Sequence, residues 1–420
     1  MNERKNIIPQ KRVLVVCQHF YPENFRINDI CTSLIGNEID VDVMCGIPNY
    51  PKGRFFEGYS YFSPRRETYN GVNVMRAGEI PQLKGGGKLF VALNYLWFPL
   101  ASLFHVPKLM CKKKYDCVFL YATSPVFMAF PGLVYAKLRN TRTVLYVLDY
   151  WPDSLYSVIP IKNRFLRAIF RRVSFWHYRH ADTIITVSNG MLKKMREEAG
   201  IPEDKSYFLP QSCEKLYETT TYDEELHERF GGKFNIIFAG NIGPAQSLET
   251  LVEAAVKLEK TGESLPDYRF ILIGDGMSRK TLNELVTGKQ MNHRFIFEGY
   301  VSPEQVLKYY ELADVLYVSL SSDELFKIML PSKIQSYMAA GKPILASLSG
   351  EGRDTILQAE CGLACESGDA NALADTIVQI LSMPRTMLSR FGENGKKYYE
   401  QNYKHEIFMD RIMDYLSMKG

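Results

Sequence analysis

The stretch NIIFAGNIGPAQSLETLVEAA, residues 235–255, decides the fold. An apolar run is followed by a turn with Gly240 and Gly243, and then by a segment that predicts a helix beginning near Ser247. Strand, glycine turn and helix in this order are typical of a doubly wound α/β domain, and the free N–H groups at such a helix start suit a phosphate. This turn has no lysine or arginine to meet the charge, so the cation must come from elsewhere in the chain.

Length and composition favour a soluble protein of two domains. The chain has 420 residues, more than one hydrophobic core usually organises. Hydrophobic residues make up 46% and charged residues 23%, close to the averages of globular proteins. The opening MNERKNIIPQKR leads straight into a short strand and shows no signal peptide. The eight cysteines lack metal-binding or disulfide spacing, so we expect reduced thiols and a cytoplasmic protein.

Charge is unevenly distributed along the chain. Residues 1–210 contain 29 lysines and arginines against 17 aspartates and glutamates, a net charge of +12, whereas the rest of the chain carries −8. A basic first half can face nucleic acid or an anionic membrane, or it can be a plain charge gradient. Because the basic residues alternate with apolar ones and no recognised binding module is present, we expect no nucleic-acid partner.

Apolar strands alternate with helix-length segments in both halves of the sequence. This pattern predicts two parallel sheets, each covered by helices on both faces. The polar segment 210–226 is the expected linker, so we expect Rossmann-like domains at 1–210 and 211–390. Residues 391–420 are expected to form helices that pack back toward the first domain. The expected strands are 12–18, 41–46, 72–78, 116–122, 143–149 and 182–188 in the first half, and 234–240, 269–274, 294–299, 315–320 and 343–348 in the second.

Two facing domains of this kind bring the carboxyl ends of both sheets to one cleft, where ligands of this architecture bind. In the second domain the turn Gly274–Gly276 follows a strand, as the turn at Gly240 does. Each glycine turn alone is weak evidence, because glycines commonly just permit a positive φ.

A third segment after a strand is more specific. The run LPSKIQSYMAAGKPILA, residues 330–346, predicts a helix with Ser332 as its N-cap and Gly341 just after its end. A well-capped helix explains this motif without any ligand. Its place in a second Rossmann-like domain nevertheless favours a diphosphate bound by the amides of Ser332 and Lys333.

Several motifs together resemble a known family. Four motifs of the second half resemble, in order and spacing, the nucleotide-binding half of the retaining, two-domain GT-B glycosyltransferases of the family-four type: AGNIGPAQSLETLVEAA, IGDGMSRKTL, FEGYVSPEQVLKYYELADV and LPSKIQSYMAAGKPILA. Four motifs of the first half resemble the subgroup that makes bacterial O-antigen and capsule and acts on aminodeoxy sugars: FYPENFRINDICTSL, GIPNYPKGRFFEGY, YVLDYWPDSL and ITVSNGM. This resemblance covers nearly the whole chain. It implies a GT-B fold and retaining transfer of a sugar, such as an N-acetylated deoxy aminosugar, from a nucleotide-sugar, which we expect to be a UDP-sugar.

Two departures from that family concern the donor site. Many members carry E-x7-E, whose second glutamate binds the nucleotide ribose; Ile328 and Ser336 stand at these positions here. Members also often supply an arginine and a lysine from the first glycine turn, where this chain has Asn241 and Gln246. We expect Lys333 to bring the missing charge without a metal, through charge-assisted bonds to the diphosphate.

The expected donor-binding residues come from both halves of the chain. Arg26 is expected to reach the donor from the first domain, and Lys327 is a second cation, although a solvated surface role is the alternative for both. Glu298 and Tyr300 are expected to frame the base. The full set is Gly240, Asn241, Gly243, Gln246, Gly274, Asp275, Gly276, Glu298, Tyr300, Lys327, Pro331, Ser332, Lys333 and Arg26.

Glycosyl transfer needs the leaving diphosphate stabilised as the anomeric carbon gains positive charge. The resemblance implies front-face attack, in which the donor phosphate takes the acceptor proton, so a carboxylate pair is not needed. Asp149 is expected to orient the acceptor or the sugar, with capping of the next turn as the alternative. The expected catalytic residues are Asp149, Lys333 and Glu23, and the expected acceptor contacts are Asn24, Asn49, Tyr50 and Trp151.

A search for metal ligands finds one D-x-D pattern, Asp40-Val41-Asp42, at the start of an apolar strand. We interpret it as charge at the edge of a strand, and the seven histidines do not cluster. We therefore expect neither a metal ion nor another cofactor.

Two segments that combine apolar and basic residues favour a lipid-linked acceptor. Residues 88–114 form a long aromatic run with basic ends, and residues 162–180 interleave arginine with phenylalanine and tryptophan. Because Asn94 and Pro99 interrupt the first run, we expect a helix that is partly buried and partly in the membrane interface, with a core helix as the alternative. We expect peripheral contact with the cytoplasmic face of the inner membrane and a polyprenyl-diphosphate-linked saccharide as acceptor.

Two other classes stay open. An inactive partner protein that has lost its glutamates fits part of the pattern, as does a nucleotide-sugar epimerase of the same architecture. The apolar-basic segments and YVLDYWPDSL favour the transferase. The residues at positions 328 and 336 keep the inactive partner open.

Overall fold

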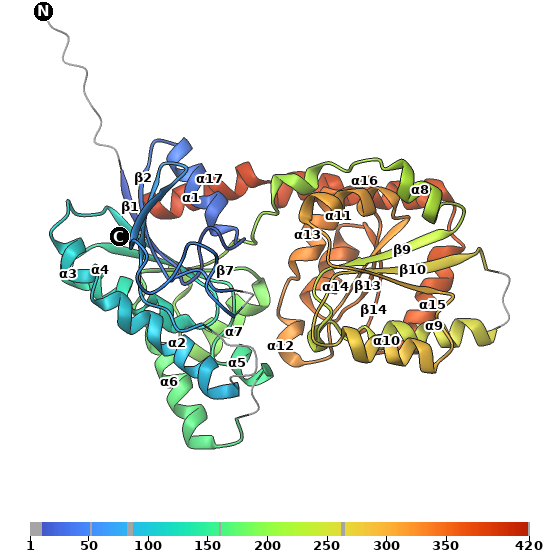
Figure 1. Ribbon diagram of the computed structural model, residues 1–420, viewed down its shortest axis with the longest axis horizontal. Coiled ribbons are helices and arrows are strands. Elements are labelled where there is room, and N and C mark those ends of the chain that lie inside the picture. The colour runs from blue at the N-terminus through green and yellow to red at the C-terminus, as the bar shows by residue number, and fades with distance from the viewer. Residues whose placement is uncertain (1–10, 51–52, 82–86, 159–160, 262–264, 419–420) are drawn as a thin grey trace, which may run out of the picture. The chain divides into compact units, whose positions relative to one another are not determined.

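The computed structural model describes residues 11–50, 53–81, 87–158, 161–261 and 265–418 (Figure 1). Contacts divide the chain into two units. Unit 1 comprises residues 1–209 and 409–420, and unit 2 comprises residues 210–408.

Unit 1 is built on an eight-stranded sheet in the order β3-β4-β2-β1-β5-β6-β7-β8. All neighbouring strands are parallel except β3 and β4, which are antiparallel. The central strands are apolar along their length because helices cover both faces of a parallel sheet. The strands are β1 (Arg12–Val16), β2 (Asp40–Cys45), β3 (Arg66–Tyr69), β4 (Val72–Arg76), β5 (Cys117–Ala122), β6 (Arg142–Val147), β7 (Thr183–Thr186) and β8 (Ser206–Phe208).

The helices of unit 1 connect these strands. Figure 1 shows α2, α3, α4 and α6 gathered on one side of the sheet, and contacts join α4 to each of the other three. The helices are α1 (Ile27–Gly36), α2 (Gly87–Leu103), α3 (Val106–Met110), α4 (Phe130–Arg139), α5 (Asp153–Val158), α6 (Arg164–His180) and α7 (Asn189–Ala199), with 3-10 turns η1 (Val126–Ala129) and η2 (Glu203–Lys205).

Unit 2 contains a six-stranded, fully parallel sheet in the order β11-β10-β9-β12-β13-β14. Alternate residues of its strands enter two apolar cores, one with α9, α10 and α15 and one with α11, α13, α14 and α16. Figure 1 shows α9 and α10 along one face of the sheet, and α11, α13 and α16 along the other. The strands are β9 (Phe234–Ala239), β10 (Tyr268–Ile273), β11 (Phe295–Gly299), β12 (Val315–Ser319), β13 (Ile344–Ser347) and β14 (Gly362–Cys365).

The helices of unit 2 follow the strands in regular alternation. They are α8 (Glu224–Phe230), α9 (Glu249–Thr261), α10 (Arg279–Gly288), α11 (Pro303–Leu312), α12 (Glu324–Lys327), α13 (Ser332–Ala339), α14 (Glu351–Gln358), α15 (Ala370–Leu381) and α16 (Arg385–Asn402), with 3-10 turns η3 (Lys215–Glu218) and η4 (Pro244–Gln246).

The last helix, α17 (His405–Ser417), begins in unit 2, and its residues from 409 onward belong to unit 1. Arg142 of β6 donates to the carbonyl of Tyr415 at 2.7 Å, and the ring of Tyr207 lies 5.0 Å from that of Tyr415. The preceding helix, α16, packs against α13 within unit 2.

Every strand that the sequence predicts is present, whereas β3, β8 and β14 were missed. All three lie at an edge of their sheet and contain four residues or fewer. Strands this short are not recognisable as an apolar run, and β3 is polar as well. The expected linker is itself folded onto unit 2, since Glu218 accepts a hydrogen bond from Tyr399 at 2.8 Å.

A search of the described residues for membrane spans finds none: no helix among them has both the length and the hydropathy to cross a bilayer. The apolar segment that begins near residue 88 forms α2, which contains Pro99, and then α3.

The D-x-D pattern does not mark strand-edge charge, because Asp42 of β2 is 2% exposed. Its carboxylate accepts hydrogen bonds from Lys112 at 2.6 Å, from Asn73 at 3.0 Å and from the hydroxyl of Tyr115. Burial alone would raise the pKa of Asp42, but the bonds from Lys112 and Tyr115 outweigh it and lower the pKa below 3.8.

We expect Asp42→Asn to lower the free energy of unfolding at pH 7 by about 2 kcal/mol, because it removes a buried charge from its donors. A carboxyl whose folded pKa is depressed stabilises the protein above its unfolded pKa, and this stabilisation is lost as the pH falls through the folded value. Urea unfolding at pH 7 and at pH 3 checks this: the difference between the two proteins should shrink at the lower pH.

Asp40→Asn is the matched control, because Asp40 is 35% exposed and pairs with Arg12 at 2.7 Å. It should cost less than about 1 kcal/mol, as exposed ion pairs do. An equal loss for Asp42→Asn at both pH values would show that its charge is not what stabilises the unit.

Candidate functional site

The loops of unit 2 meet at the switch point of its sheet. From β9 the sheet grows through β10 and β11 on one side, and through β12, β13 and β14 on the other. In open α/β sheets ligands bind outside the carboxyl ends of the strands at such a point. Two hydrogen bonds tie the loops after β9 and β12 together there, from Ser321 N to the Ala245 carbonyl at 2.8 Å and from the Ser319 hydroxyl to the Gln246 carbonyl at 2.6 Å.

Two glycine turns at this point are packed directly against each other. A side chain at Gly274 would place its Cβ 1.9 Å from the carbonyl oxygen of Gly240, and Gly274 has a φ of +129°. Ile242 N donates to the carbonyl of Asp275 at 2.9 Å, and the Asp275 carboxylate accepts from the amide of Gly276 at 2.8 Å. Glycine is therefore required by the packing of these turns, and Asp275 holds its own turn.

The polar side chains of the first turn bond to one another. Oε1 of Gln246 accepts from the amide of Gly243 at 3.2 Å and from the side chain of Asn241 at 3.4 Å. The Gly243 amide, expected at a phosphate, thus has a partner within its own turn. The helix expected near Ser247 begins at Glu249, because η4 comes first and Ser247 takes a left-handed φ of +45°.

Lys333 of α13 lies beside the first turn. Its Nζ is 3.8 Å from the centroid of the Phe238 ring, and a Cβ on Gly240 would stand 2.5 Å from its Cε. The side chain is half-buried, and within the described part of the chain no carboxylate forms an ion pair with it. Gly240 therefore leaves the space that the lysine side chain occupies.

Burial lowers the pKa of Lys333 from 10.5 to about 7. The charged form is disfavoured because the ammonium has lost water and gained only a ring face in exchange. A bound anion would supply the missing counter-charge. This makes Lys333 the best anion-binding candidate in unit 2.

The segment before Lys333 differs from the prediction in one respect. Pro331 is the N-cap of α13, and Ser332 is the first helical residue, exposed and without a capping hydrogen bond. The amides of Ser332 and Lys333 have no preceding helical carbonyl to bond, as at every helix start, whereas the amide of Ile334 donates to the Pro331 carbonyl at 3.0 Å. Lys327 is 41% exposed and pairs with Glu324 at 2.5 Å, so this second cation lies at the surface.

Glu298 is occupied by neighbouring side chains. Its carboxylate accepts from Arg229 at 2.7 and 3.0 Å and from the hydroxyl of Tyr309 at 2.7 Å. Tyr300 is 78% exposed just after β11. Of the two residues expected to frame a base, Tyr300 is the one whose side chain is open to a ligand.

The positions of the missing glutamates offer no carboxylate. Ser336 is buried in α13 and bonds within its own helix, and Ile328 is half-buried. A carboxylate that sequence reasoning missed, Glu366, follows the edge strand β14. It accepts from Arg353 at 2.8 Å and from the hydroxyl of Ser349. The only signal for Glu366 in the sequence was its position just after β14, and that strand was not predicted.

In unit 1, Glu23 links the loop after β1 to the loop after β2. The carboxylate is 2% exposed, and Oε1 accepts from the amides of Asn49 at 2.8 Å and Tyr50 at 2.6 Å. Oε2 lies 3.0 Å from Nδ1 of His19. Asn49 is buried as well, whereas Tyr50 is 49% exposed. Glu23 thus positions the Tyr50 loop, and both of its oxygens are already bonded.

Asn24 and Arg26 lie on the same loop after β1. Asn24 is exposed, and Arg26 is half-buried at the N-cap position of α1. The expected contacts of Asn24 with the acceptor and of Arg26 with the donor stay predictions.

Asp149 and Trp151 follow β6 but differ in access. Asp149 is half-buried, and burial raises its pKa from 3.8 to about 6. Trp151 is 1% exposed; its indole N–H donates to Ser124, and its ring packs against that of Phe127 at 5.2 Å. The indole is closed to direct contact with an acceptor, so we assign Trp151 a packing role.

A buried carboxyl that sequence reasoning missed, Glu79, lies in the loop after β4. It is fully buried and accepts from Gln18 and Asn94, both at 2.7 Å, while Oε2 has no hydrogen-bond partner. Burial raises the pKa of Glu79 well above 4.5, which disfavours its charged form. Its place at the end of a short apolar run gave no signal of this role.

Among the described residues, no three His, Cys, Asp or Glu side chains are grouped so as to hold a metal ion. The expected independence from metal stays a prediction.

Family models match both parts of the chain. Residues 222–398 match the model "Glycosyl transferases group 1", and residues 26–211 match "Glycosyltransferase Family 4". The first match lies in unit 2, and the second lies almost wholly in unit 1.

Curated relatives agree with these models. The chain is 28% identical over 322 residues to the probable glycosyltransferase WbjE of Pseudomonas aeruginosa, covering 74% of this chain and 77% of the relative. It is 25% identical over 318 residues to the putative colanic acid biosynthesis glycosyl transferase WcaI of Escherichia coli K12, covering 72% and 74%.

Solved structures share the fold at low sequence identity. Sucrose-phosphate synthase from Thermosynechococcus elongatus superposes with a TM-score of 0.73 at 17% identity, covering 96% of this chain and 98% of the other. Anabaena Alr3699/HepE in complex with UDP gives a TM-score of 0.71 at 14% identity, covering 97% and 99%. With a family model on each part of the chain and this shared fold, the protein is a family-4-type glycosyltransferase with the GT-B fold.

Proposed function

We propose that this enzyme transfers a sugar from a UDP-sugar to a polyprenyl-diphosphate-linked saccharide in bacterial surface polysaccharide synthesis. The transfer retains the anomeric configuration and needs no metal ion. An N-acetylated deoxy aminosugar is the proposed donor sugar. The enzyme acts at the cytoplasmic face of the inner membrane, with which it is peripherally associated.

The proposed donor site is supported above all by the environment of Lys333. A half-buried ammonium over the Phe238 ring, beside Gly240 and at a sheet switch point, is favourable when an anion binds it. The amides of Ser332 and Lys333 and the positive end of the dipole of α13 add to the same place. A diphosphate matches this combination of one cation and several N–H donors.

The relatives support the choice of donor and pathway. HepE of Anabaena has been solved with UDP and with UDP-glucose, which supports a uridine nucleotide. WcaI is described as a colanic acid biosynthesis enzyme, which supports a role in surface polysaccharide synthesis. The polyprenyl acceptor follows from the resemblance and from the basic and apolar character of the first half.

The chemistry is divided between charge stabilisation and acceptor orientation. As the bond to the diphosphate breaks, negative charge grows on the leaving oxygen, and Lys333 with the first-turn amides of α13 stabilises it. The attacking hydroxyl of the acceptor gives its proton to the departing donor phosphate as the hydroxyl oxygen bonds to the anomeric carbon. Asp149, with a pKa of about 6, is ionised at pH 7 and orients the acceptor sugar by accepting a hydrogen bond from one of its other hydroxyls. Glu23 holds the loop that presents Tyr50.

A second candidate is an inactive partner protein. Position 336 is a buried serine and position 328 an isoleucine, so the glutamates that bind ribose in many relatives are absent. Calorimetry of the purified protein with UDP-, GDP- and dTDP-sugars, without added metal, decides between the two. Saturable binding of UDP-sugars supports the enzyme, and silence across the panel supports the inactive partner.

Lys333→Ala should weaken UDP-sugar binding by about thirtyfold, because it removes a charge-assisted bond to the diphosphate. Gln246→Ala should change affinity less than about threefold, because a neutral amide contributes less. Lys327→Ala is the control for loss of a surface cation. Equal small effects for all three variants in calorimetry would contradict the division of labour between Lys333 and the first turn.

Binding of a UDP-sugar should take up about one proton at pH 8, since free Lys333, with a pKa of about 7, is mostly neutral there and becomes charged beside the diphosphate. Affinity should accordingly fall as the pH rises from 6 to 9. Calorimetry in buffers of different ionisation enthalpy measures the uptake, and the diphosphate diester of a UDP-sugar does not itself titrate in this range.

Lys333→Arg is the matched control for proton uptake, because arginine stays charged throughout this range. It should bind the UDP-sugar without taking up a proton. The same uptake in the variant and the native protein would assign the proton to another group.

Asp149→Asn should lower kcat by about a hundredfold and leave UDP-sugar affinity unchanged. In the native enzyme the rate should fall as the pH drops below about 6, because protonation removes the acceptor of the hydrogen bond. Sugar transfer to a lipid extract that carries polyprenyl-diphosphate saccharides measures this. A variant that keeps the full rate, or the same acid limb, would assign Asp149 a structural role.

A further inference from the structure

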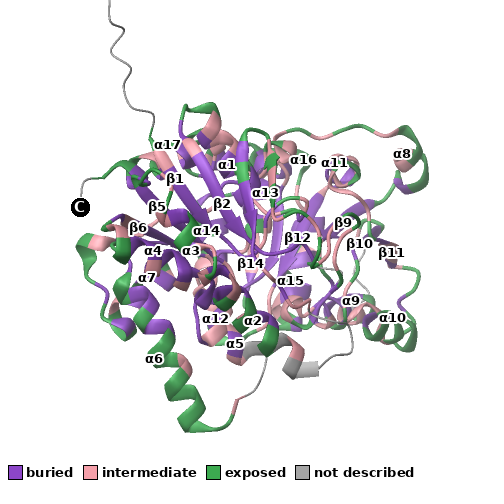
Figure 2. Cartoon of the chain, turned by 60° about the vertical axis from the view of Figure 1, so that its left-hand side comes forward, coloured by how far each residue is buried: buried purple, intermediate pink, exposed green. Residues whose placement is uncertain are grey.

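Exposed apolar side chains gather on two neighbouring helices of unit 1, α2 and α6. Figure 2 shows that the part of α6 that extends from the body of the unit is almost entirely exposed. We call this surface the α2–α6 patch. Its members are between 38% and 81% exposed: Leu96, Trp97, Leu100 and Phe104 of α2, and Phe165, Leu166, Ile169, Val173 and Trp176 of α6.

An apolar groove runs between the two helices within this patch. It has a volume of about 540 Å³ and is lined by Leu96 and Leu100 on one side and by Ile169 and Val173 on the other. His177 at its base is buried, which lowers its pKa to about 4 and leaves the ring neutral at pH 7. A surface this large and this apolar is unusual on a soluble protein and indicates a partner.

Arg172 borders the apolar side of α6. Counting about 100° per residue, it lies about 60° from Ile169, at one flank of the stripe that contains Ile169 and Val173, whereas Arg167 lies on the opposite side of the helix. Arg172 also lines the groove itself. The helix is therefore amphipathic, with a cation at one margin of its apolar stripe.

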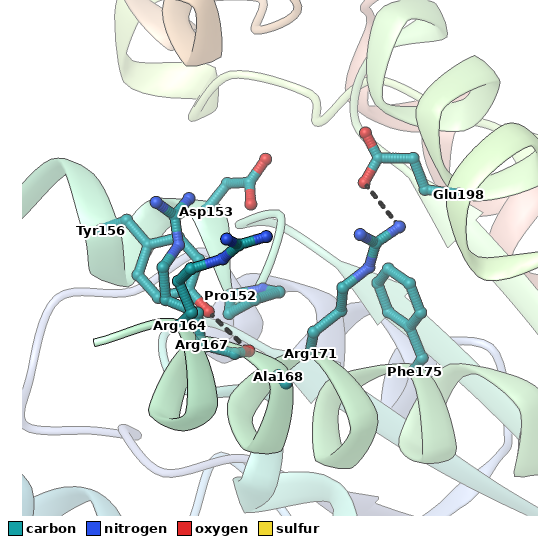
Figure 3. A pocket seen from close by; sticks show the side chains of 9 residues that line it. All are labelled: Pro152, Asp153, Tyr156, Arg164, Arg167, Ala168, Arg171, Phe175 and Glu198. Carbon is teal, nitrogen blue, oxygen red and sulfur yellow. Dashed lines mark hydrogen bonds and ion pairs between the residues drawn. The ribbon is translucent and has the colours of Figure 1, made fainter. Parts of the chain in front are cut away.

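Figure 3 shows the opposite side of α6, where Arg164, Arg167 and Arg171 rise together into a pocket of about 390 Å³. Two carboxylates, Asp153 and Glu198, face them, and Arg171 approaches Glu198 at 3.9 Å. This side of the helix is polar and suited to water. The apolar stripe and the polar side thus divide α6 along its length.

The charge around the patch favours an anionic bilayer over a second copy of the chain as its partner. A second copy of the chain placed on the patch would bury Arg172 against an apolar groove whose described lining residues include no carboxylate to pair with it. An anionic bilayer instead offers acyl chains to the apolar stripe and phosphates to Arg172. The tryptophans at positions 97 and 176 suit the interface, where an indole has both apolar and polar surroundings.

We propose that the α2–α6 patch docks unit 1 on an anionic bilayer, with its apolar side chains among the acyl chains and Arg172 at the lipid phosphates. This inference rests on the proposed function in one respect, because it names the surface that brings the enzyme to a lipid-linked acceptor. The binding itself needs neither donor nor acceptor.

Co-sedimentation of the full chain with phosphatidylcholine vesicles, with and without phosphatidylglycerol, tests the proposal. We expect binding to the anionic vesicles that weakens as salt is added. The double variant Leu100→Ser/Ile169→Ser should partition about tenfold less, because two apolar side chains no longer enter the bilayer. Arg172→Gln should weaken binding to anionic vesicles about fivefold and leave binding to neutral ones unchanged.

Leu357→Ser is the matched control, since Leu357 of α14 is 43% exposed, as Ile169 is at 42%, but lies in unit 2. It should not change partitioning. Vesicles with brominated acyl chains should quench Trp97 and Trp176, whereas Trp151, at 1% exposure, should stay unquenched. The variant Trp97→Phe/Trp176→Phe should therefore lose the quenching.

Failure to bind anionic vesicles, or binding that the double variant leaves intact, would overturn the proposal. Concentration-dependent dimers of the native chain that the double variant abolishes would replace the bilayer with a second copy. UDP-sugar binding is measured on the same samples by calorimetry. Loss of vesicle binding with intact UDP-sugar binding rejects the docking surface alone, whereas the reverse result rejects the donor site alone.

Discussion

The proposed donor site depends on one unfavourable arrangement, an ammonium that is half-buried without a described carboxylate beside it. Lys333 faces the ring of Phe238 and the backbone of Gly240, and its pKa falls to about 7 as a result. Removing this charge from water costs folding free energy, and an anion bound at the site offsets that cost. A lysine buried in this way is poised to prefer an occupied site over an empty one.

The packing of the two glycine turns makes that arrangement possible. The turn at Gly274 lies against the Gly240 carbonyl, which fixes the backbone where a side chain would otherwise collide with the lysine. Hydrogen bonds from Ser319 and Ser321 then fasten the turn to the loop that leads into α13. This turn is neutral and self-bonded through Gln246, and the cation beside it, Lys333, belongs to α13.

The sequence alone predicted the central strands of both sheets, because burial on both faces demands unbroken apolar runs such as CVFLYA in β5. It also indicated Lys333 as a candidate anion-binding residue, since Lys333 lies at a helix start in the segment after a strand. Edge strands such as β14 were missed because they are so short, at four residues in β14. Glu366, which follows β14, was missed for the same reason. Glu79 could not be found either, because its role depends on Gln18 and Asn94, which are distant in sequence and adjacent only in the fold. Trp151 was misjudged for the opposite reason: an aromatic residue beside a candidate Asp149 fits a binding loop and a core equally well.

In unit 1, buried carboxyls hold the polar loops that follow the apolar strands. Two buried carboxyls do this in two ways. Glu23 accepts two backbone amides of the Tyr50 loop, whereas Glu79 accepts two side-chain amides. Burial raises the pKa of Glu79, and the nearby Glu23 carboxyl raises it further, so the charged form of Glu79 is disfavoured. The same unit therefore holds two buried carboxyls in its loops by two different sets of donors.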